Sequence, residues 1–153
     1  MKKIFLIAFI TILGFATKAE AQINWMNMNQ ALEAQKKNKK PIFLDAYTNW
    51  CGPCKMLDKQ TFSNETFAAY INKNYNPVKF NAEGNEEIQF NGKLYKNPRY
   101  QESRKNSRNS VHDFTLAIGV KAYPTMIVID EKGKITHNIM GVRSAEDLMN
   151  LLQ

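Results

Sequence analysis

The chain has 153 residues, of which 44% are apolar, and a formal net charge of +7 at pH 7. This length suits a single domain whose core needs no stapling by disulfides. Much of the positive charge lies in residues 36–40 and 93–108. We interpret both stretches as solvated basic faces and expect no nucleic-acid partner, because net charge alone is weak evidence for one.

The amino terminus predicts an export signal. Two lysines precede an almost continuous apolar run over residues 4–15, and Ala19 and Ala21 supply small side chains at the positions that a signal peptidase reads. The run is shorter than the roughly 20 residues of a membrane-spanning helix, and no cysteine follows it for lipid attachment. We expect cleavage of residues 1–21 near Ala21, a folded domain over 22–153, and a periplasmic or otherwise exported protein.

The first half of the domain alternates helices with strands. We predict a helix over 25–38, a strand over 42–47, a helix opened by Pro53, a further helix capped by Ser63 or Asn64, and a strand over 77–81. This order predicts a right-handed crossover between parallel neighbouring strands.

Residues 83–109 interrupt this pattern and are interpreted as an insertion. Asn91-Gly92 predicts a hairpin turn between 88–90 and 94–95. Residues 97–109 are polar, basic and without period, so we expect an exposed, mobile loop there.

Regular structure returns after the insertion. We expect Ser110 to cap a helix together with Asp113, and Gly119 to end it. A strand over 124–129, a turn, an antiparallel strand over 135–140 and a helix starting at Ser144 complete the chain. The sequence therefore predicts an α/β domain with a small mixed sheet flanked by helices.

The two cysteines of the chain, Cys51 and Cys54, are separated by only two residues in the stretch WCGPCK. A bridge closing so short a loop would stabilise the fold by about 2 kcal/mol, which makes a poor staple. A zinc site needs about four ligands, and neither His112 nor His137 stands at ligand-like spacing. We therefore expect no metal, and redox chemistry is the interpretation that remains.

The positions of these thiols predict a division of labour. Cys51 precedes the helix that Pro53 opens, where free N–H groups and the helix dipole stabilise a thiolate, so we expect Cys51 to attack a substrate disulfide. Cys54, one turn further along, would resolve the mixed disulfide. Asp45, an acid inside an apolar strand, is our candidate acceptor for the proton of Cys54.

The direction of electron flow is predicted from the residues between the cysteines. Gly52 and Pro53 carry no charged or hydrogen-bond-donating side chain that would stabilise the Cys51 thiolate, which favours a reductase over an oxidase or isomerase. Two further alternatives stay open. One is a copper-binding module that uses Cys51, Cys54 and a nearby Met or His, and the other is a redox-silent adaptor that binds partners through 83–109.

WCGPCK, preceded by Phe43-Leu44-Asp45-Ala46 and followed by Tyr123-Pro124-Thr125, resembles the thioredoxin family from about residue 25 to the end, apart from 83–109. The resemblance implies a thioredoxin-like fold with a central mixed β-sheet flanked by helices. It also implies a protein-disulfide reductase whose redox-active disulfide, Cys51–Cys54, takes the place of a cofactor.

Carried over by position, the resemblance implies a set of site residues. The catalytic set comprises the nucleophile Cys51, the resolving Cys54, the buried acid Asp45 and its neighbouring lysine, Lys79. The substrate-binding set comprises Trp50, Gly52, Pro53, Tyr123, Pro124 and Gly141. Within the second set, Pro124 matches the family's cis proline, and Gly141 matches the glycine that lets substrate approach.

The chain also departs from the small cytosolic members of the family. It has an export signal and an insertion, and no proline lies midway along the active-site helix. Residues 59–64 instead resemble the exported thioredoxin-like subgroup. This implies disulfide-containing protein substrates and a membrane-embedded electron donor, and we expect a monomer.

Overall fold

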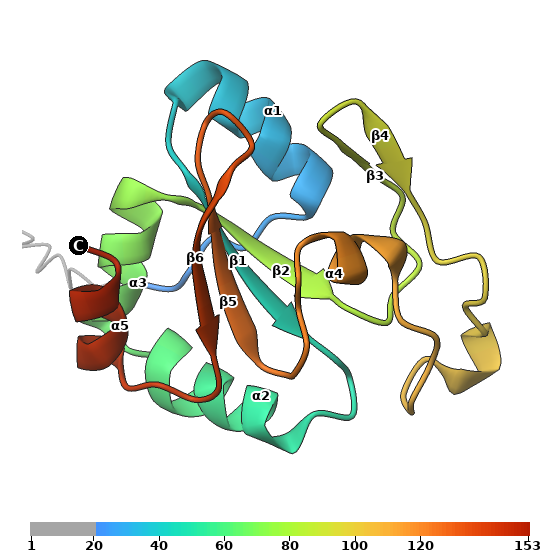
Figure 1. The fold of residues 1–153 in the computed structure, drawn as a ribbon. Helices are drawn as coiled ribbons and strands as arrows, with labels where there is room; N and C mark the ends of the chain where they lie inside the picture. The colour runs from blue at the N-terminus through green and yellow to red at the C-terminus, as the bar shows by residue number, and fades with distance from the viewer. Residues whose placement is uncertain (1–20) are drawn as a thin grey trace, which may run out of the picture.

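The computed structural model describes residues 21–153 (Figure 1). Apart from Ala21, the predicted signal segment lies outside the described residues. The helices are α1 (Met28–Asn38), α2 (Gly52–Leu57), the π-helical η1 (Asp58–Phe62), α3 (Glu65–Asn74), the 3₁₀ helix η2 (Glu102–Arg104), α4 (Asp113–Ala117) and α5 (Ala145–Leu151). The strands are β1 (Ile42–Tyr47), β2 (Asn76–Asn81), β3 (Ile88–Phe90), β4 (Lys93–Tyr95), β5 (Thr125–Ile129) and β6 (Ile135–Met140).

A four-stranded sheet in the order β2-β1-β5-β6 forms the centre of the domain. Strands β1 and β2 run parallel and are joined through α2, η1 and α3, whereas β5 is antiparallel to both β1 and β6. This mixed sheet with flanking helices confirms the predicted fold class. Within residues 21–153, no helix combines the length and apolarity needed to cross a membrane.

Both faces of the sheet are covered, which explains why β1 reads as an almost continuous apolar run. Ile42, Leu44 and Ala46 join a core cluster with residues of α1, β3 and α4. Phe43 points to the opposite cluster, which is filled from α2, η1, α3 and α5. The alternation of side chains along a strand thus divides one apolar run between two cores.

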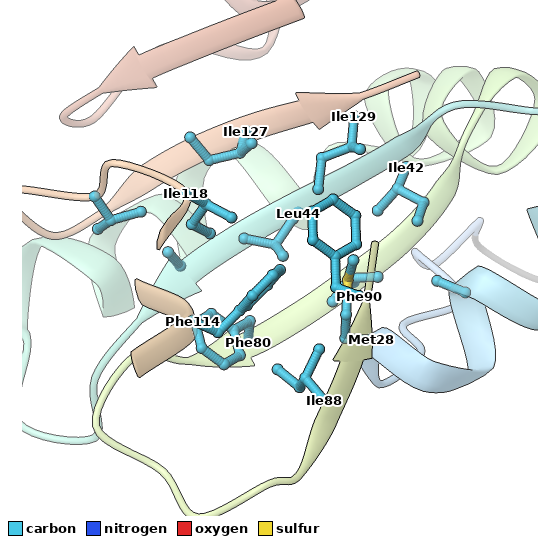
Figure 2. Close-up of a cluster of buried hydrophobic side chains, with 14 of the residues drawn as sticks. Met28, Ile42, Leu44, Phe80, Ile88, Phe90, Phe114, Ile118, Ile127 and Ile129 are labelled. Atoms are coloured by element: carbon cyan, nitrogen blue, oxygen red, sulfur yellow. The ribbon is translucent and has the colours of Figure 1, made fainter. Parts of the chain in front are cut away.

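The first half of the insertion belongs to the core. Strands β3 and β4 form the predicted hairpin, with Asn91 and Gly92 at the positive φ values of 48° and 76°. Figure 2 shows Ile88 and Phe90 packed towards Phe114, and the Phe90 and Phe114 ring centroids lie 5.4 Å apart. The hairpin therefore extends one apolar layer of the domain.

Residues 97–109 form the second half of the insertion and lie mostly exposed, as predicted. They contain η2, and the Asn109 side chain closes the loop by hydrogen bonds with the backbone N–H and C=O of Gln101. Nearer the core, the Asn97 amide donates to the carbonyl oxygens of Gly84 and Ser110. The loop is thus closed internally by Asn109 and anchored to the rest of the domain at its base by Asn97.

Two predicted helix starts are wrong. The first helix begins at Met28 and not at residue 25, because Asn27 forms a capping box with Gln30. Met26, predicted to be helical, instead forms a β-bridge with Val78 of β2.

The predicted cap of α4 is also wrong. The Ser110 hydroxyl donates to Asn97 Oδ1, and His112 Nδ1 accepts the Phe114 N–H and caps the helix. His112 is completely buried, and its Nε2 lies 2.6 Å from the carbonyl oxygen of Glu86. This histidine therefore ties α4 to the insertion.

Candidate redox site

Cys51 and Cys54 form a disulfide at the amino end of α2. Cys51 is the N-cap, and its Sγ accepts the backbone N–H of Cys54 at 3.1 Å. Each cysteine is only 3% exposed, whereas Gly52 and Pro53 between them are exposed. The sulfur of Cys51 therefore already occupies the position where backbone N–H groups and the helix dipole would stabilise a thiolate.

The active-site helix continues into a π-helical segment. Helix α2 passes directly into η1, and Asp58 donates its N–H to the carbonyl oxygen of Cys54. Short π-helical segments within α-helices are frequent at functional sites. Here the segment begins with Asp58, whose carboxylate turns towards β2 and pairs with Lys79.

Asp45 lies in the middle of β1 and is fully buried. Its Oδ2 accepts a hydrogen bond from Lys79 Nζ at 2.7 Å, but its Oδ1 has no hydrogen-bond partner among the residues that the structure describes. Burial raises the pKa of Asp45 to about 6, although the positive charge of Lys79 opposes this rise. A carboxyl group with this pKa can take up and release a proton close to neutral pH.

Lys79 faces Asp45 across the parallel pair β1–β2 and is held between two acids. Its Nζ bonds to both Asp45 and Asp58. Burial alone would lower the pKa of Lys79, but these two carboxylates raise it. The ammonium group also lies 4.9–5.3 Å from three ring centroids, those of Trp25, Tyr47 and Phe62.

Asp58 is a functional candidate that sequence reasoning missed. Its side chain is about half exposed and, with Trp25, Phe62 and Lys79, lines a pocket of about 400 Å³. The pocket exposes Lys79 to solvent, and Lys79 in turn bonds to the buried Asp45. The available signal was an acidic residue one helical turn after Cys54, on the side of the helix that faces the sheet.

Trp50 connects the disulfide to the segment around the cis proline. Its ring meets that of Tyr123 edge to face, with 6.0 Å between centroids. The Tyr123–Pro124 bond is cis, as the resemblance implied. The N–H of Gly141 donates to the carbonyl oxygen of Pro124, and Gly141 has a φ of +84°, a conformation that favours glycine. The predicted substrate-binding residues therefore include a contiguous group beside the thiols.

The insertion reaches this group through contacts that sequence reasoning did not anticipate. Trp50 Nε1 donates to Glu83 Oε2 at 2.8 Å, and the N–H of Asn109 donates to the same oxygen at 2.8 Å. The guanidinium carbon of Arg108 lies 4.6 Å from the centroid of the Trp50 ring. Such pairings depend on how the loop folds back, and no local pattern indicates them.

Other features of the domain lie away from the thiols. A larger pocket of about 790 Å³ lies between α1, the β3–β4 hairpin and the β5–β6 turn, and contains none of the predicted site residues. Within residues 21–153, no group of three or more His, Cys, Asp or Glu side chains is arranged to hold a metal ion.

Comparison with known proteins agrees with this geometry. Residues 28–153 match the family model described as a thioredoxin-like domain. The chain belongs to the thioredoxin-like domain family. It is 28% identical over 127 residues to the thiol:disulfide interchange protein DsbD of Campylobacter jejuni. The aligned region covers 83% of this chain but only 18% of that relative. The chain thus spans less than a fifth of the curated relative's length.

Solved structures support the fold assignment. A putative disulphide-isomerase from Bacteroides thetaiotaomicron is similar with a TM-score of 0.61 and 25% identity, over 86% of this chain and 91% of that one. A thioredoxin from Thermus thermophilus has a TM-score of 0.63 at 11% identity, over 86% and 85% of the two chains. At that identity the second likeness concerns the fold alone.

Proposed function

We propose that this protein is an exported thiol–disulfide oxidoreductase that reduces disulfides in other proteins. The observation that carries the proposal is the Cys51–Cys54 disulfide at the amino end of α2, with the Cys51 sulfur already accepting a backbone N–H. The similarity to DsbD, named a thiol:disulfide interchange protein, supports the same chemistry.

The reaction starts from the reduced dithiol. The Cys51 thiolate attacks one sulfur of a substrate disulfide, forms a mixed disulfide and releases the first substrate thiol. Cys54 then loses its proton and attacks the sulfur of Cys51, which releases the second substrate thiol and closes the Cys51–Cys54 bond. Two electrons pass to the substrate, so no cofactor beyond the dithiol is required.

Asp45 is the proposed proton acceptor for Cys54. Its buried carboxyl has a pKa of about 6, so it is mostly ionised at pH 7 yet is a better base than an ordinary aspartate. Lys79 is a positioning residue, because its Nζ holds Asp45 Oδ2 at 2.7 Å. The bare Oδ1 leaves one acceptor of the carboxylate available.

The substrate binds across the exposed Gly52-Pro53 turn and the cis-proline segment. An extended substrate strand would pair with the backbone of Tyr123, while Trp50 covers the thiols and Gly141 leaves room beside Pro124. We propose a reductase because the Gly52-Pro53 turn supplies no side chain that would stabilise the thiolate of Cys51 further.

The proposed setting rests on the amino-terminal export signal that the sequence predicts. After cleavage near Ala21 the domain would work in the periplasm or an equivalent compartment. Its proposed partners are disulfide-containing proteins as substrates and a membrane-embedded protein as electron donor, and we propose that it acts as a monomer.

Mixed-disulfide trapping tests the function. A Cys54→Ala variant should hold substrate proteins on Cys51 as adducts that dithiothreitol releases, and the matched Cys51→Ala variant should hold few or none. Wild-type protein should reduce insulin, and both variants should lose this activity. Equal trapping by the two variants, or insulin reduction by the Cys51→Ala variant, would refute the proposed roles.

A further inference from the structure

The exposed half of the insertion carries a concentration of positive charge. Residues 97–109 contain four basic side chains, Arg99, Arg104, Lys105 and Arg108, and one acidic side chain, Glu102. All five are exposed, and Glu102 pairs with Lys105 at 3.2 Å. Within residues 21–153, none of the three arginines forms an ion pair.

This charge lies beside the redox site and is held there by several contacts. Asn49 lies only two residues before Cys51, and its side-chain amide donates to the carbonyl oxygen of Lys105 at 2.6 Å. Arg108 lies over the ring of Trp50, the residue that directly precedes Cys51. Figure 1 shows the η2 region next to the connection between β1 and α2.

The charged groups around the disulfide are mostly of one sign. Lys55 follows Cys54 and is exposed, and Lys121 is exposed two residues before Tyr123. The nearby acid Glu83 is only 8% exposed, and its Oε2 accepts from both Trp50 and Asn109. A docking partner would therefore meet a mostly positive rim, since Glu83 faces inward, Glu102 is paired with Lys105, and the half-exposed Asp58 is paired with Lys79.

We propose that the arginines of segment 97–109, above all Arg104 and Arg108, form a cationic wall that selects protein substrates whose disulfide is flanked by acidic side chains. This inference rests on the proposed function and names the substrate class of the same site. Carboxylates beside the substrate disulfide would be attracted as the substrate approaches Cys51, which raises the rate of encounter and fixes the orientation of the strand.

Matched peptides provide the test. Two synthetic peptides share one disulfide-closed loop and differ only in having glutamates or glutamines on either side of it. The second-order rate constant for their reduction by pre-reduced protein is measured at low salt and at 0.5 M NaCl. We expect the glutamate peptide to react about tenfold faster at low salt and the ratio to fall towards one at high salt, because screening weakens exposed charges.

Charge reversal then locates the effect. The R104E/R108E variant should lower the ratio below one, whereas K132E/K134E, an equal charge change in the distant β5–β6 turn, should leave it as in the wild type. Because each ratio is measured on one protein sample, a reduced folded fraction cancels. Equal rate constants for the two peptides in the wild type, or a ratio unchanged in R104E/R108E, would overturn the proposal.

A neutral substrate separates this inference from the function on which it rests. Wild-type protein should reduce hydroxyethyl disulfide, which carries no charge. If the protein reduced hydroxyethyl disulfide but showed no preference between the two peptides, the role of the cationic wall would be refuted and the proposed oxidoreductase function would stand. If the protein reduced none of the three substrates, both the cationic wall and the proposed oxidoreductase function would be refuted.

Discussion

Lys79 Nζ lies 2.7 Å from Oδ2 of the fully buried Asp45 and at the same time pairs with Asp58 on the active-site helix. One ammonium group is thus shared between an acid in the core and an acid at the surface. Burial of Asp45 outweighs the opposing charge and hydrogen bond of Lys79, so the pKa of Asp45 stays raised at about 6.

Asp45 should reduce stability at neutral pH. An acid whose pKa is higher in the folded state than in the unfolded state contributes stability below the unfolded pKa of 3.8, and this contribution is lost as the pH rises through about 6. We expect Asp45→Asn to raise the free energy of unfolding of the oxidised protein by about 2–3 kcal/mol at pH 7. Near pH 4 most of this gain should vanish.

Urea denaturation at the two pH values measures this difference. Lys79 keeps Asp58 as a partner in the variant, so the ammonium is not left buried and alone. Glu131→Gln, at an exposed turn, is the control and should change stability little at either pH. A variant less stable than the wild type at pH 7 would show that the pair with Lys79 outweighs burial.

Asp58 should set the pH at which the thiols work. The negative charge of Asp58 raises the pKa of Asp45. Without that charge, Asp45 would be the single carboxylate paired with Lys79. In Asp58→Asn we therefore expect the acid limb of the pH profile for disulfide reduction to move to lower pH. Stopped-flow reduction of hydroxyethyl disulfide by pre-reduced protein between pH 4.5 and 8 measures it, with Glu131→Gln as control. A uniform fall in rate with an unmoved limb would mean that Asp58 only supports the helix.

Glu83 should hold the insertion against the redox site. Its carboxylate accepts from Trp50 Nε1 and from the N–H of Asn109, and hydrogen bonds to a charged group are worth about 1.5–3 kcal/mol each. In Glu83→Ala we expect trypsin to cleave after Arg104, Lys105 or Arg108 roughly tenfold faster. Glu87→Ala, the control, removes only an exposed ion pair with Lys96, and trypsin should cleave this variant as slowly as the wild type. Equal cleavage of all three proteins would contradict this anchoring.

His112 should make the domain sensitive to mild acid. Burial lowers the pKa of His112, because removal from water disfavours the charged ring, and this outweighs the opposing effects of the Glu86 carbonyl and of Asp113. A charged ring would also be unable to accept the Phe114 N–H. Stability is thus complete above the ordinary pKa of 6.5 and declines as the pH falls below it. His112→Asn keeps a good helix cap without a titrating group, so its urea midpoint should depend less on pH between 7 and 5. His137→Asn, on β6, should behave as the wild type; an identical pH dependence in His112→Asn would exclude this role.

The fold could be predicted from the sequence because its signals are local. Apolar alternation, Pro53 at a helix start and Asn91-Gly92 at a hairpin each act within a few residues. The start of α1 was misplaced although Asn27 and Gln30 form a readable capping box. The cap of α4 was misplaced because the Ser110 hydroxyl is bound by Asn97, thirteen residues away in sequence.

The candidate site was predictable only where it follows the family pattern. Cys51, Cys54 and Asp45 could be placed from motif and spacing, and Lys79 from the resemblance alone. The structure brings the acid and the lysine together as the resemblance implied. Asp58 was missed because its spacing of one helical turn from Cys54 was not used, and its pairing with Lys79 joins segments that are distant in the sequence. The contact of Arg108 with Trp50 was missed because it is set by the path of a loop whose sequence has no period.

The reduction potential of the Cys51–Cys54 couple tests the central claim most directly. Equilibration of the protein with glutathione buffers of known ratio, followed by acid quenching and thiol labelling, gives the potential. We predict a value near −270 mV, at the thioredoxin end of the family scale, as a protein-disulfide reductase requires. A value near −120 mV would make the protein an oxidant, and a couple that fails to equilibrate with glutathione would contradict thiol–disulfide exchange itself.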